Sequence, residues 1–287
     1  VLVNDFEHHR YNPDGTSEKT DDVYEKILTE KGRQERASLE FYYSRQYSSV
    51  TIERAEIIRP DGSIIAIDIA ANSRDAVESS QMQSNIYDPN HKVVSLKIAG
   101  LRIGDVLHYT WTQKVVKARV PDMWCDYFVL QSTNPILRYR IVVDAPETLP
   151  LRKIVLKDEV KNSVTSSQIK KDGRIVYEWL AKDVPRIFEE PSMPAYYTVV
   201  QRLLVSTEPD WKAISAWYWR LSSPHLDKTT PAMQEKVREL TAGLTTPEER
   251  IKAIFSFVAN QIRYMGITTE TEAPGYEPHD VNITFEN

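Results

Sequence analysis

The chain has 287 residues, of which 41% are hydrophobic and 27% charged, a balance typical of a folded globular protein and not of a disordered one. Its net charge of −5 argues against a nucleic-acid-binding protein, which usually carries a basic surface. No apolar run reaches the roughly 18 residues that a membrane-spanning helix needs, so we expect no transmembrane segment in this chain. The single cysteine excludes an internal disulfide bond.

Residues 1–205 are predicted to form mainly β-strands, because short turn signals separate segments of alternating apolar residues. The clearest hairpin pairs residues 50–58 with residues 63–69 around Asp61 and Gly62. Glycine suits this turn because it adopts positive φ angles without a steric penalty. Three further Asp-containing turns lie near residues 13–15, 104–105 and 171–173.

Three segments of this part are less regular. Residues 22–30 could form a strand, whereas residues 33–43 are more typical of a short helix. Residues 72–90 are polar and have no period, and we expect them to form a long surface loop.

The later strands follow a period of two, which places alternate side chains on one face of a sheet. Predicted strands cover residues 93–98, 105–115, 126–131, 137–143, 175–179 and 197–205. Many strands joined by short turns predict a large antiparallel β-sandwich-like N-terminal domain. The expected fold class is therefore α+β, mainly β.

The pattern changes near residue 206, where we place the boundary between a domain of residues 1–205 and a helical part of residues 206–287. Apolar residues recur at helical spacing from residue 211 and again from residue 231. Thr246 and Glu249 form a predicted capping box, with Pro247 in the first turn. Residues 246–262 are the best-specified helix in the chain.

Two parts of the sequence match one bacterial architecture in their order and spacing. The first part comprises residues 26–29, 58–63, 100–106, 128–135 and 190–194. It resembles the β-rich domain of unknown function that precedes transglutaminase-like cores in many envelope proteins. The second comprises residues 257–267 and 275–279, and resembles the first long helix of the transglutaminase-like core and the loop after it.

This resemblance implies a papain-like core whose cysteine nucleophile, histidine and aspartate lie beyond Asn287. A thiolate is favoured at a helix N-terminus and by a neighbouring histidine, which is the chemistry that such a core needs. Because the sequence starts at Val1 and not at methionine, we also expect the natural N-terminus to be missing. An extracytoplasmic location in a bacterium, in the periplasm or at the cell surface, is implied by the resemblance alone.

No residue of this chain is assigned a catalytic, cofactor-binding or metal-binding role. Cys125 has no neighbouring histidine in the sequence and is interpreted as a structural cysteine. His8 and His9 are adjacent, so they would point to opposite faces of a strand and could not easily bind one ion. The other histidines lack the spacing of metal ligands.

Tyr264, Tyr276 and His279 are the candidate cleft-lining residues, because they flank the loop of the predicted core. Each has a plainer interpretation as a packing residue. Trp217 and two further tryptophans of the same segment, Trp211 and Trp219, could form a sugar-binding platform, but their helical spacing favours packing within or between domains.

The sequence therefore predicts a non-catalytic fragment of a cysteine acyltransferase or peptidase that acts on amide bonds. Its partner would be the protein or peptide substrate of the parent protein. The alternative is a binding or scaffold module for a glycan, a peptide or a partner protein, with no enzymatic role.

Overall fold

The computed structural model describes residues 1–80, 88–226, 228–263 and 276–286. Contacts divide the chain into two compact units, Val1–Asp210 and Trp211–Asn287, which are described separately below. The last strand of the first unit ends at Ser206.

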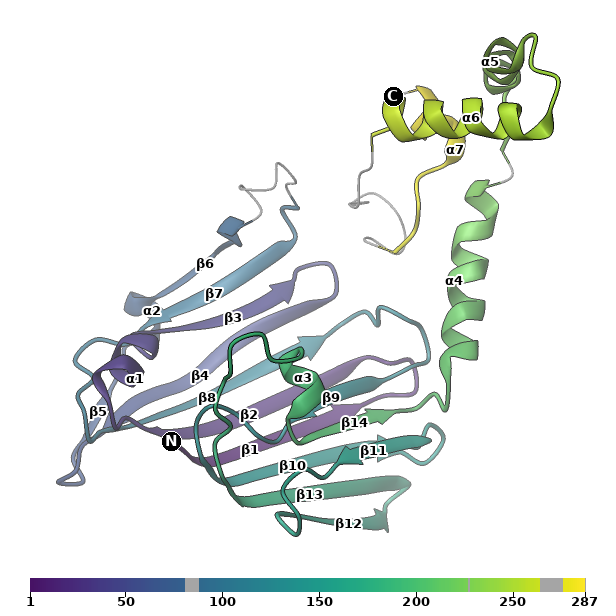
Figure 1. The fold of residues 1–287 in the computed structure, drawn as a ribbon. Coiled ribbons are helices and arrows are strands. Elements are labelled where there is room, and N and C mark those ends of the chain that lie inside the picture. Colours follow the sequence, from purple (N-terminus) through teal and green to yellow (C-terminus); the bar gives the residue numbers. More distant parts are fainter. Residues whose placement is uncertain (81–87, 227, 264–275, 287) are drawn as a thin grey trace. The chain divides into compact units, whose positions relative to one another are not determined.

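The first unit is a β domain built on an eight-stranded sheet (Figure 1). The strand order in this sheet is β12-β13-β10-β1-β2-β8-β4-β5. Its strands are β1 (Leu2–Tyr11), β2 (Ser17–Lys26), β4 (Ser48–Ile58), β5 (Ile64–Ala66), β8 (Val106–Val115), β10 (Ile136–Pro146), β12 (Val164–Lys171) and β13 (Arg174–Val184).

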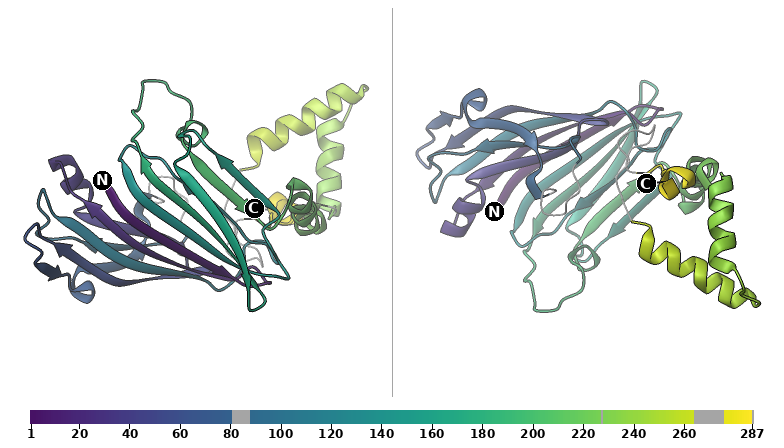
Figure 2. Two further views of the ribbon diagram at one scale, coloured as in Figure 1. Left: turned by 90° about the horizontal axis from the view of Figure 1, so that it is seen from below. Right: turned by 90° about the horizontal axis from the view of Figure 1, so that it is seen from above.

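Two three-stranded sheets complete the domain. One has the order β3-β7-β6 and comprises β3 (Ser38–Ser44), β6 (Ser73–Val77) and β7 (His91–Lys97). The other has the order β11-β14-β9 and comprises β9 (Cys125–Val129), β11 (Lys153–Lys157) and β14 (Arg202–Ser206). Short helices α1 (Glu30–Glu35), α2 (Ile69–Asn72) and α3 (Tyr196–Val199) lie in the connections. Figure 2 shows α1 at the strand ends where the first residue lies.

The mainly β, α+β class predicted from the sequence is confirmed, with antiparallel pairing throughout all but one ladder. The exception is β1 with β10, which run parallel, so that Glu7 lies opposite Ile141. The predicted hairpin is also confirmed, since Ile58 of β4 pairs with Ile64 of β5 and Gly62 adopts a φ of 84°.

Two of the irregular segments were predicted wrongly. Residues 33–43 contain only the end of α1, because Thr29 caps that helix and it stops at Glu35. Leu39 and Phe41 then alternate with exposed residues in β3, which is the period of a strand. Residues 73–77 of the expected loop form β6, paired with β7.

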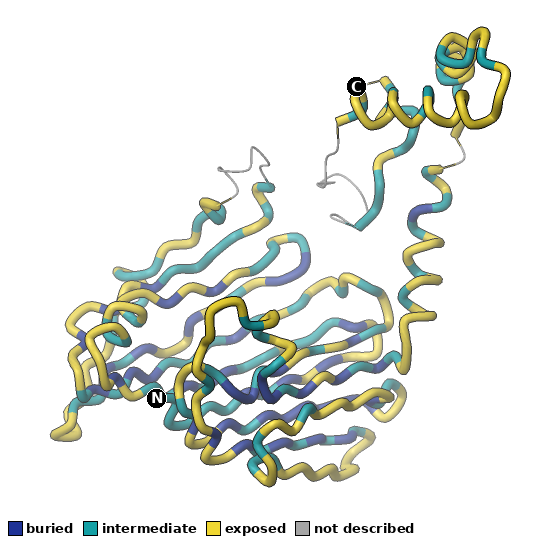
Figure 3. Tube along the Cα trace, in the orientation of Figure 1, coloured by how far each residue is buried: buried dark blue, intermediate teal, exposed yellow. Residues whose placement is uncertain are grey.

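Both small sheets pack on the same face of the large sheet. One core lies between β9 and β14 on one side and β10 and β13 on the other, and includes Ile141, Trp179 and Leu203. The second core lies between β3 and β7 and the opposing β4 and β8, and includes Phe41, Ile57 and Leu107. The register across β10, β1, β2, β8 and β4 keeps these large-sheet residues on one face. Buried residues follow these strands in Figure 3.

The second unit is helical. It contains α4 (Trp211–Leu226), α5 (Pro231–Thr241), α6 (Pro247–Gln261) and α7 (Val281–Glu286). The capping box of Thr246 and Glu249 is present at the start of α6, as predicted. Ile251 and Phe255 on the apolar side of α6 are 68% and 70% exposed, so this face has little cover (Figure 3). None of the helices in the described ranges is long and apolar enough to cross a membrane.

Candidate functional site

Charged side chains occupy the face of the large sheet between the two hydrophobic cores. They come from β1 and β2, where Asp5, Glu7 and His9 share a face with Lys19 and Asp21. Buried charges are costly unless they are paired and hydrogen bonded. This polar network is therefore the part of the β domain whose residues are least explained by packing alone.

Glu7 lies at the centre of the network. His9 Nε2 lies 2.8 Å from its Oε1, and the Lys19 ammonium and the Tyr139 hydroxyl also donate to its carboxylate. Burial raises the pKa of Glu7, but hydrogen bonds from His9 and Lys19 together with their positive charges outweigh it and lower the pKa to about 2. Glu7 is thus held as a carboxylate with three donors around it.

Asp5 and Asp21 form a second pair of carboxyl groups on the same face. Burial raises the pKa of Asp5 well above its usual value, and the charge and hydrogen bond of Asp21 raise it further. Burial also raises the pKa of Asp21, whose Oδ2 accepts a hydrogen bond from Trp111 Nε1 at 3.1 Å. The Oδ1 atoms of both aspartates are buried and lack a donor among the described residues. The two side chains share a hydrogen bond, which requires one proton between them as in other close acid pairs, so the pair keeps one negative charge.

Replacing Asp5 with asparagine tests this shared proton. The folded-state pKa of Asp5 is raised, so its contribution to stability is lost as the pH rises above the usual value of 3.8. Asparagine keeps a donor toward Asp21 and carries no charge. We expect Asp5→Asn to be at least as stable as the parent at pH 7, and its stability to vary less between about pH 4 and 7. Urea unfolding across this range measures both effects.

The control for this substitution is Asp14→Asn in an exposed turn, where Thr16 donates to the aspartate and the pKa of Asp14 is lowered. It should not reproduce the gain in stability. A loss of more than about 1 kcal/mol in Asp5→Asn at pH 7 would show that Asp5 is needed as a carboxylate.

His9 joins the polar network to β9. Its ring meets Trp124 and Phe128 edge to face, with centroids 5.6 and 5.2 Å apart, and its Nδ1 lies 3.4 Å from Asp126 Oδ2. Cys125 alternates with these residues and therefore points to the other side of β9. Its side chain is exposed, and partial burial of the thiol followed by the charge of Asp126 raises its pKa. His9 thus contacts the neighbours of Cys125 in the sequence but lies on the opposite side of β9 from the thiol. A nucleophilic cysteine needs a lowered pKa, whereas the pKa of Cys125 is raised.

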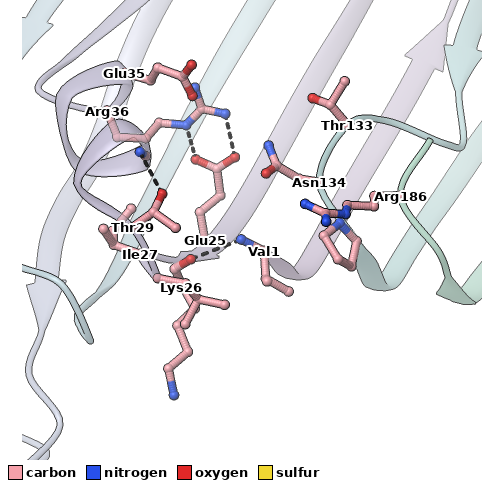
Figure 4. Close-up of a pocket in the computed structure, with 13 residues that line it drawn as sticks. Val1, Glu25, Lys26, Ile27, Thr29, Glu35, Arg36, Thr133, Asn134 and Arg186 are labelled. Carbon is pink, nitrogen blue, oxygen red and sulfur yellow. Dashed lines mark hydrogen bonds and ion pairs between the residues drawn. The ribbon is translucent and has the colours of Figure 1, made fainter. Parts of the chain in front are cut away.

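Two pockets open beside the polar network, and both are lined by Glu35 and Arg36. The smaller, of about 220 Å³, is shown in Figure 4. Arg36 donates two hydrogen bonds to Glu25 on one side of it, and Asn134 and Arg186 lie on the other. The larger, of about 840 Å³, follows β3 and reaches Tyr109 on β8. Burial raises the pKa of Tyr109 well above its usual value, and so do, in decreasing order, the charges of Glu25, Asp21 and Asp5. The carboxylates of the network therefore lie close to the inner wall of this larger pocket.

Two of the three candidate cleft residues lie in different environments, and the third lies outside the described residues. Tyr264 lies outside the described residues. Tyr276 is half-buried, and its ring meets Trp217 of α4 edge to face at 5.7 Å, which is a packing contact. His279 is exposed and is not packed against a core. The expected cleft is therefore not tested by these residues.

An ion cluster in the second unit holds residues 277–280, which include His279. His225 Nδ1 lies 2.7 Å from Asp280 Oδ1, and its Nε2 lies 2.8 Å from Glu277 Oε1. Lys228 also binds Asp280 at 2.9 Å. The hydrogen bond with Asp280 raises the pKa of His225 despite some opposing desolvation. Both ring nitrogens of His225 are thus engaged in holding the loop onto the end of α4.

The tryptophans of α4 and the paired histidines of β1 can also be compared with the structure. Trp211 and Trp219 are 77% and 63% exposed, so these two side chains are not packed within the helical unit, and packing between domains stays a prediction. They lie on α4 and Trp217 alone of the three is half-buried. In the part of the chain that the structure describes, no three His, Cys, Asp or Glu side chains are arranged to bind a metal ion. His8 and His9 do lie on opposite faces of β1, since His8 stacks on Phe6 while His9 meets Trp124.

Sequence reasoning missed the polar network because its members lie on strands that are distant in the sequence. Tyr139 and Asp126 reach it from β10 and β9. The signal that was present is local: Asp5, Glu7 and His9 put charged groups at every second position of one strand, on a face that a buried strand would fill with apolar residues.

A β domain of three sheets followed by a helical unit defines the class of this protein. A family model matches residues 13–188. The chain belongs to this family, DUF3857, described as a domain of unknown function with a solved structure. A search of curated proteins finds no match.

One solved structure shows the same fold. The chain is similar to a protein from Parabacteroides distasonis ATCC 8503 described as a "putative protease", with a TM-score of 0.78 and 17% identity. This similarity covers 99% of the chain but only 54% of the Parabacteroides protein. Two carbohydrate-binding modules from the scaffoldin cipA of Clostridium thermocellum also match, with 12% identity over 39% and 38% of the chain and 65% and 73% of the modules. Their TM-scores of 0.21 are too low to support an argument about fold or ligand.

Proposed function

We propose that the chain is the accessory β domain and the first helices of a longer, transglutaminase-like cysteine acyltransferase or peptidase. In this proposal the parent protein acts on amide bonds outside the cytoplasm of a bacterium. Its nucleophile lies outside residues 1–287, and these residues alone are inactive. The β domain then serves to recognise or position the protein substrate.

The observation that carries this proposal is the uncovered apolar face of α6. Ile251, Phe255 and Val258 lie at helical spacing and are 68%, 70% and 50% exposed. A helix with such a stripe normally buries it against a core. The second unit supplies little cover, since Ser222 is its only buried residue among those described. The length of the Parabacteroides protein beyond the matched part is consistent with a larger core in the relatives of this chain.

The chemistry proposed for the parent protein is acyl transfer through a thioester. A thiolate attacks the amide carbonyl, and a histidine gives a proton to the departing amine. Water or a second amine then attacks the thioester and releases the thiol. Cys125 does not fit the role of the thiolate, because its pKa is raised and His9 faces the opposite side of β9.

The test compares the full-length protein with residues 1–287. We expect the full-length protein to release amine from a glutamine-containing peptide or to transfer its acyl group to hydroxylamine, and iodoacetamide to abolish this activity. Residues 1–287 should be inactive, and Cys125→Ser in the full-length protein should retain full activity.

The thiol of Cys125 supplies an independent measurement. Because its pKa is raised, the folded chain should react with iodoacetamide at pH 7 more slowly than free cysteine does. Two results contradict the proposal: a full-length protein without a cysteine after Asn287, or loss of activity on Cys125→Ser.

A second function, a binding module with no enzymatic role, is favoured by the larger pocket beside β3. Its volume of about 840 Å³ and its length along the strand suit a polymeric ligand. The exposed strand edge beside that pocket favours a peptide over a glycan.

A further inference from the structure

Strand β3 has one hydrogen-bonding edge that no described residue uses. It is at the end of its sheet, and its only ladder is with β7. Ala37 O accepts a hydrogen bond from Ile98 N before the strand, and Arg45 N donates to Asn90 O after it. Both residues are odd-numbered, so the odd positions of β3 direct their backbone groups to β7. In an antiparallel ladder the even positions then direct theirs away from it.

The outward backbone groups belong to Ser38, Glu40 and Tyr42. Across the described chain, none of their N–H or C=O groups has a hydrogen-bond partner outside the β3–β7 ladder. The side chains of these three residues are exposed, whereas Leu39 and Phe41 point into the core. An open edge of this kind is a template for pairing with another extended chain.

The larger pocket lies along this edge. It is lined by consecutive residues from Gln34 to Phe41, by Lys97 of β7 and by Tyr109. Below β3, Phe41 contacts Trp111 of β8 at 4.9 Å between ring centroids, so β3 lies above β8. A strand added to the edge would lie about 4.8 Å from β3. The strand of the large sheet next to β8, on the side away from β4, is β2.

The surface of β2 beneath such a strand is acidic. Asp21 and Glu25 point to the same face as the polar network, and Asp5 contacts Asp21 from β1. Glu25 is paired with Arg36, and Lys19 binds Glu7 and lies 3.8 Å from Asp21 Oδ2. Asp5 and Asp21 are left with one buried oxygen each that has no donor among the described residues. A cationic side chain fits this site by charge.

We propose that the β3 edge and the acidic floor of β2 form a binding site for an extended peptide that carries a lysine or arginine. The peptide adds a strand to the β3-β7-β6 sheet through Ser38, Glu40 and Tyr42. Side chains of the bound peptide alternate between the large sheet and solvent, so every second one faces the acidic side chains of β2, which include Asp21 and Glu25. Backbone pairing supplies affinity and the basic side chain supplies selectivity, as in other cases of recognition by strand addition.

This site does not depend on the proposed acyl-transfer activity. It would bind a substrate segment if the parent protein is a peptidase, and a partner segment if it is a scaffold. Binding measured without any turnover therefore separates the two proposals.

The probe is an alternating valine–lysine peptide of about ten residues, blocked at both ends and labelled with fluorescein, titrated with the whole chain in an anisotropy experiment. Three matched probes accompany it: an alternating valine–glutamate peptide, the valine–lysine peptide with alternate backbone amides methylated, and a labelled chitin oligosaccharide. We expect the valine–lysine peptide to bind, and the glutamate and methylated peptides to bind at least about tenfold more weakly. The oligosaccharide should not bind.

A matched pair of variants tests the strand edge itself. Glu40→Pro removes the outward N–H of Glu40 but takes no hydrogen bond from the β3–β7 ladder. Glu40→Ala removes the same side chain and keeps the N–H. We expect Glu40→Pro to weaken binding about tenfold or more, and Glu40→Ala to change it less than about twofold. Thermal unfolding of both variants identifies a folding defect, and in that case methylation of the probe remains as the test of backbone pairing.

Three outcomes overturn the inference. The valine–lysine peptide fails to bind at about 1 mM, or the methylated peptide binds equally well, which indicates only electrostatic adsorption. The third outcome is equal binding by Glu40→Pro and Glu40→Ala when both variants are folded, because the peptide then lies elsewhere.

Discussion

Glu7→Gln is expected to destabilise the β domain by about 3 kcal/mol, because it leaves the half-buried Lys19 without a full counter-charge. Glu7 is 6% exposed and accepts from Lys19, His9 and Tyr139. Glutamine retains the shape of the side chain, so the effect reports the charge and not a cavity. Urea unfolding at pH 7, followed by tryptophan fluorescence, measures the change.

The pH dependence of the same variant has a defined sign. The folded-state pKa of Glu7 is depressed to about 2 from its usual 4.5. Its stabilising contribution is therefore present above about pH 4.5 and is lost as the pH falls toward 2. The stability of Glu7→Gln should therefore fall less than that of the parent between about pH 4.5 and 2. Glu18→Gln is the control, because Glu18 pairs with Lys114 on the surface and its loss should cost less than about 1 kcal/mol. Similar losses in both variants would show that Glu7 is not the centre of the network.

Trp179→Ala is expected to cost about 3 to 5 kcal/mol, the range for truncation of a large buried aromatic side chain. Trp179 is 4% exposed, lies opposite Ile141 in the β10–β13 ladder, and stacks with Tyr177 at 6.1 Å between ring centroids. The side chain fills the core beneath β14. Chemical unfolding followed by far-ultraviolet circular dichroism measures the loss.

The control for Trp179→Ala is the same chemical change at an exposed position. Trp219 on α4 is 63% exposed, and its replacement by alanine should change the stability of the β domain by less than about 0.5 kcal/mol. An equal effect at the two positions would mean that the core around Trp179 does not determine the stability of the domain.

Strands with a strong period of two were predictable from the sequence. Ile175, Tyr177 and Trp179 alternate in β13 as expected, and the helix that starts after Thr246 has the predicted cap. In both cases the local pattern and the tertiary packing require the same structure. Strand β3 was not predicted, because the charged residues before it continue a helical pattern from α1. Its ladder with β7 and the packing of Phe41 on Trp111 are tertiary contacts that the local pattern does not show.

The candidate sites could not be predicted in this way, because they depend on residues that are distant in the sequence. The polar network requires Glu7 to meet Tyr139, a residue 132 positions away, through a parallel ladder that no local signal specifies. The open edge of β3 is likewise a property of strand order and not of its own residues. Conversely, the loop around Tyr276 and His279 looked like a site because its residues are close in sequence, yet the histidine engaged there is His225 of α4.

The parallel β1–β10 ladder has a consequence for how the β domain assembles. All strands up to β8 lie on one side of this ladder in the sequence, and all strands from β9 onward lie on the other. Each half supplies its own small sheet and most of one hydrophobic core. The domain is therefore two consecutive folding units that share a single seam. Local contacts within each half can form early, whereas the β1–β10 ladder and the Glu7–Tyr139 hydrogen bond join residues far apart in the sequence and form when the halves meet.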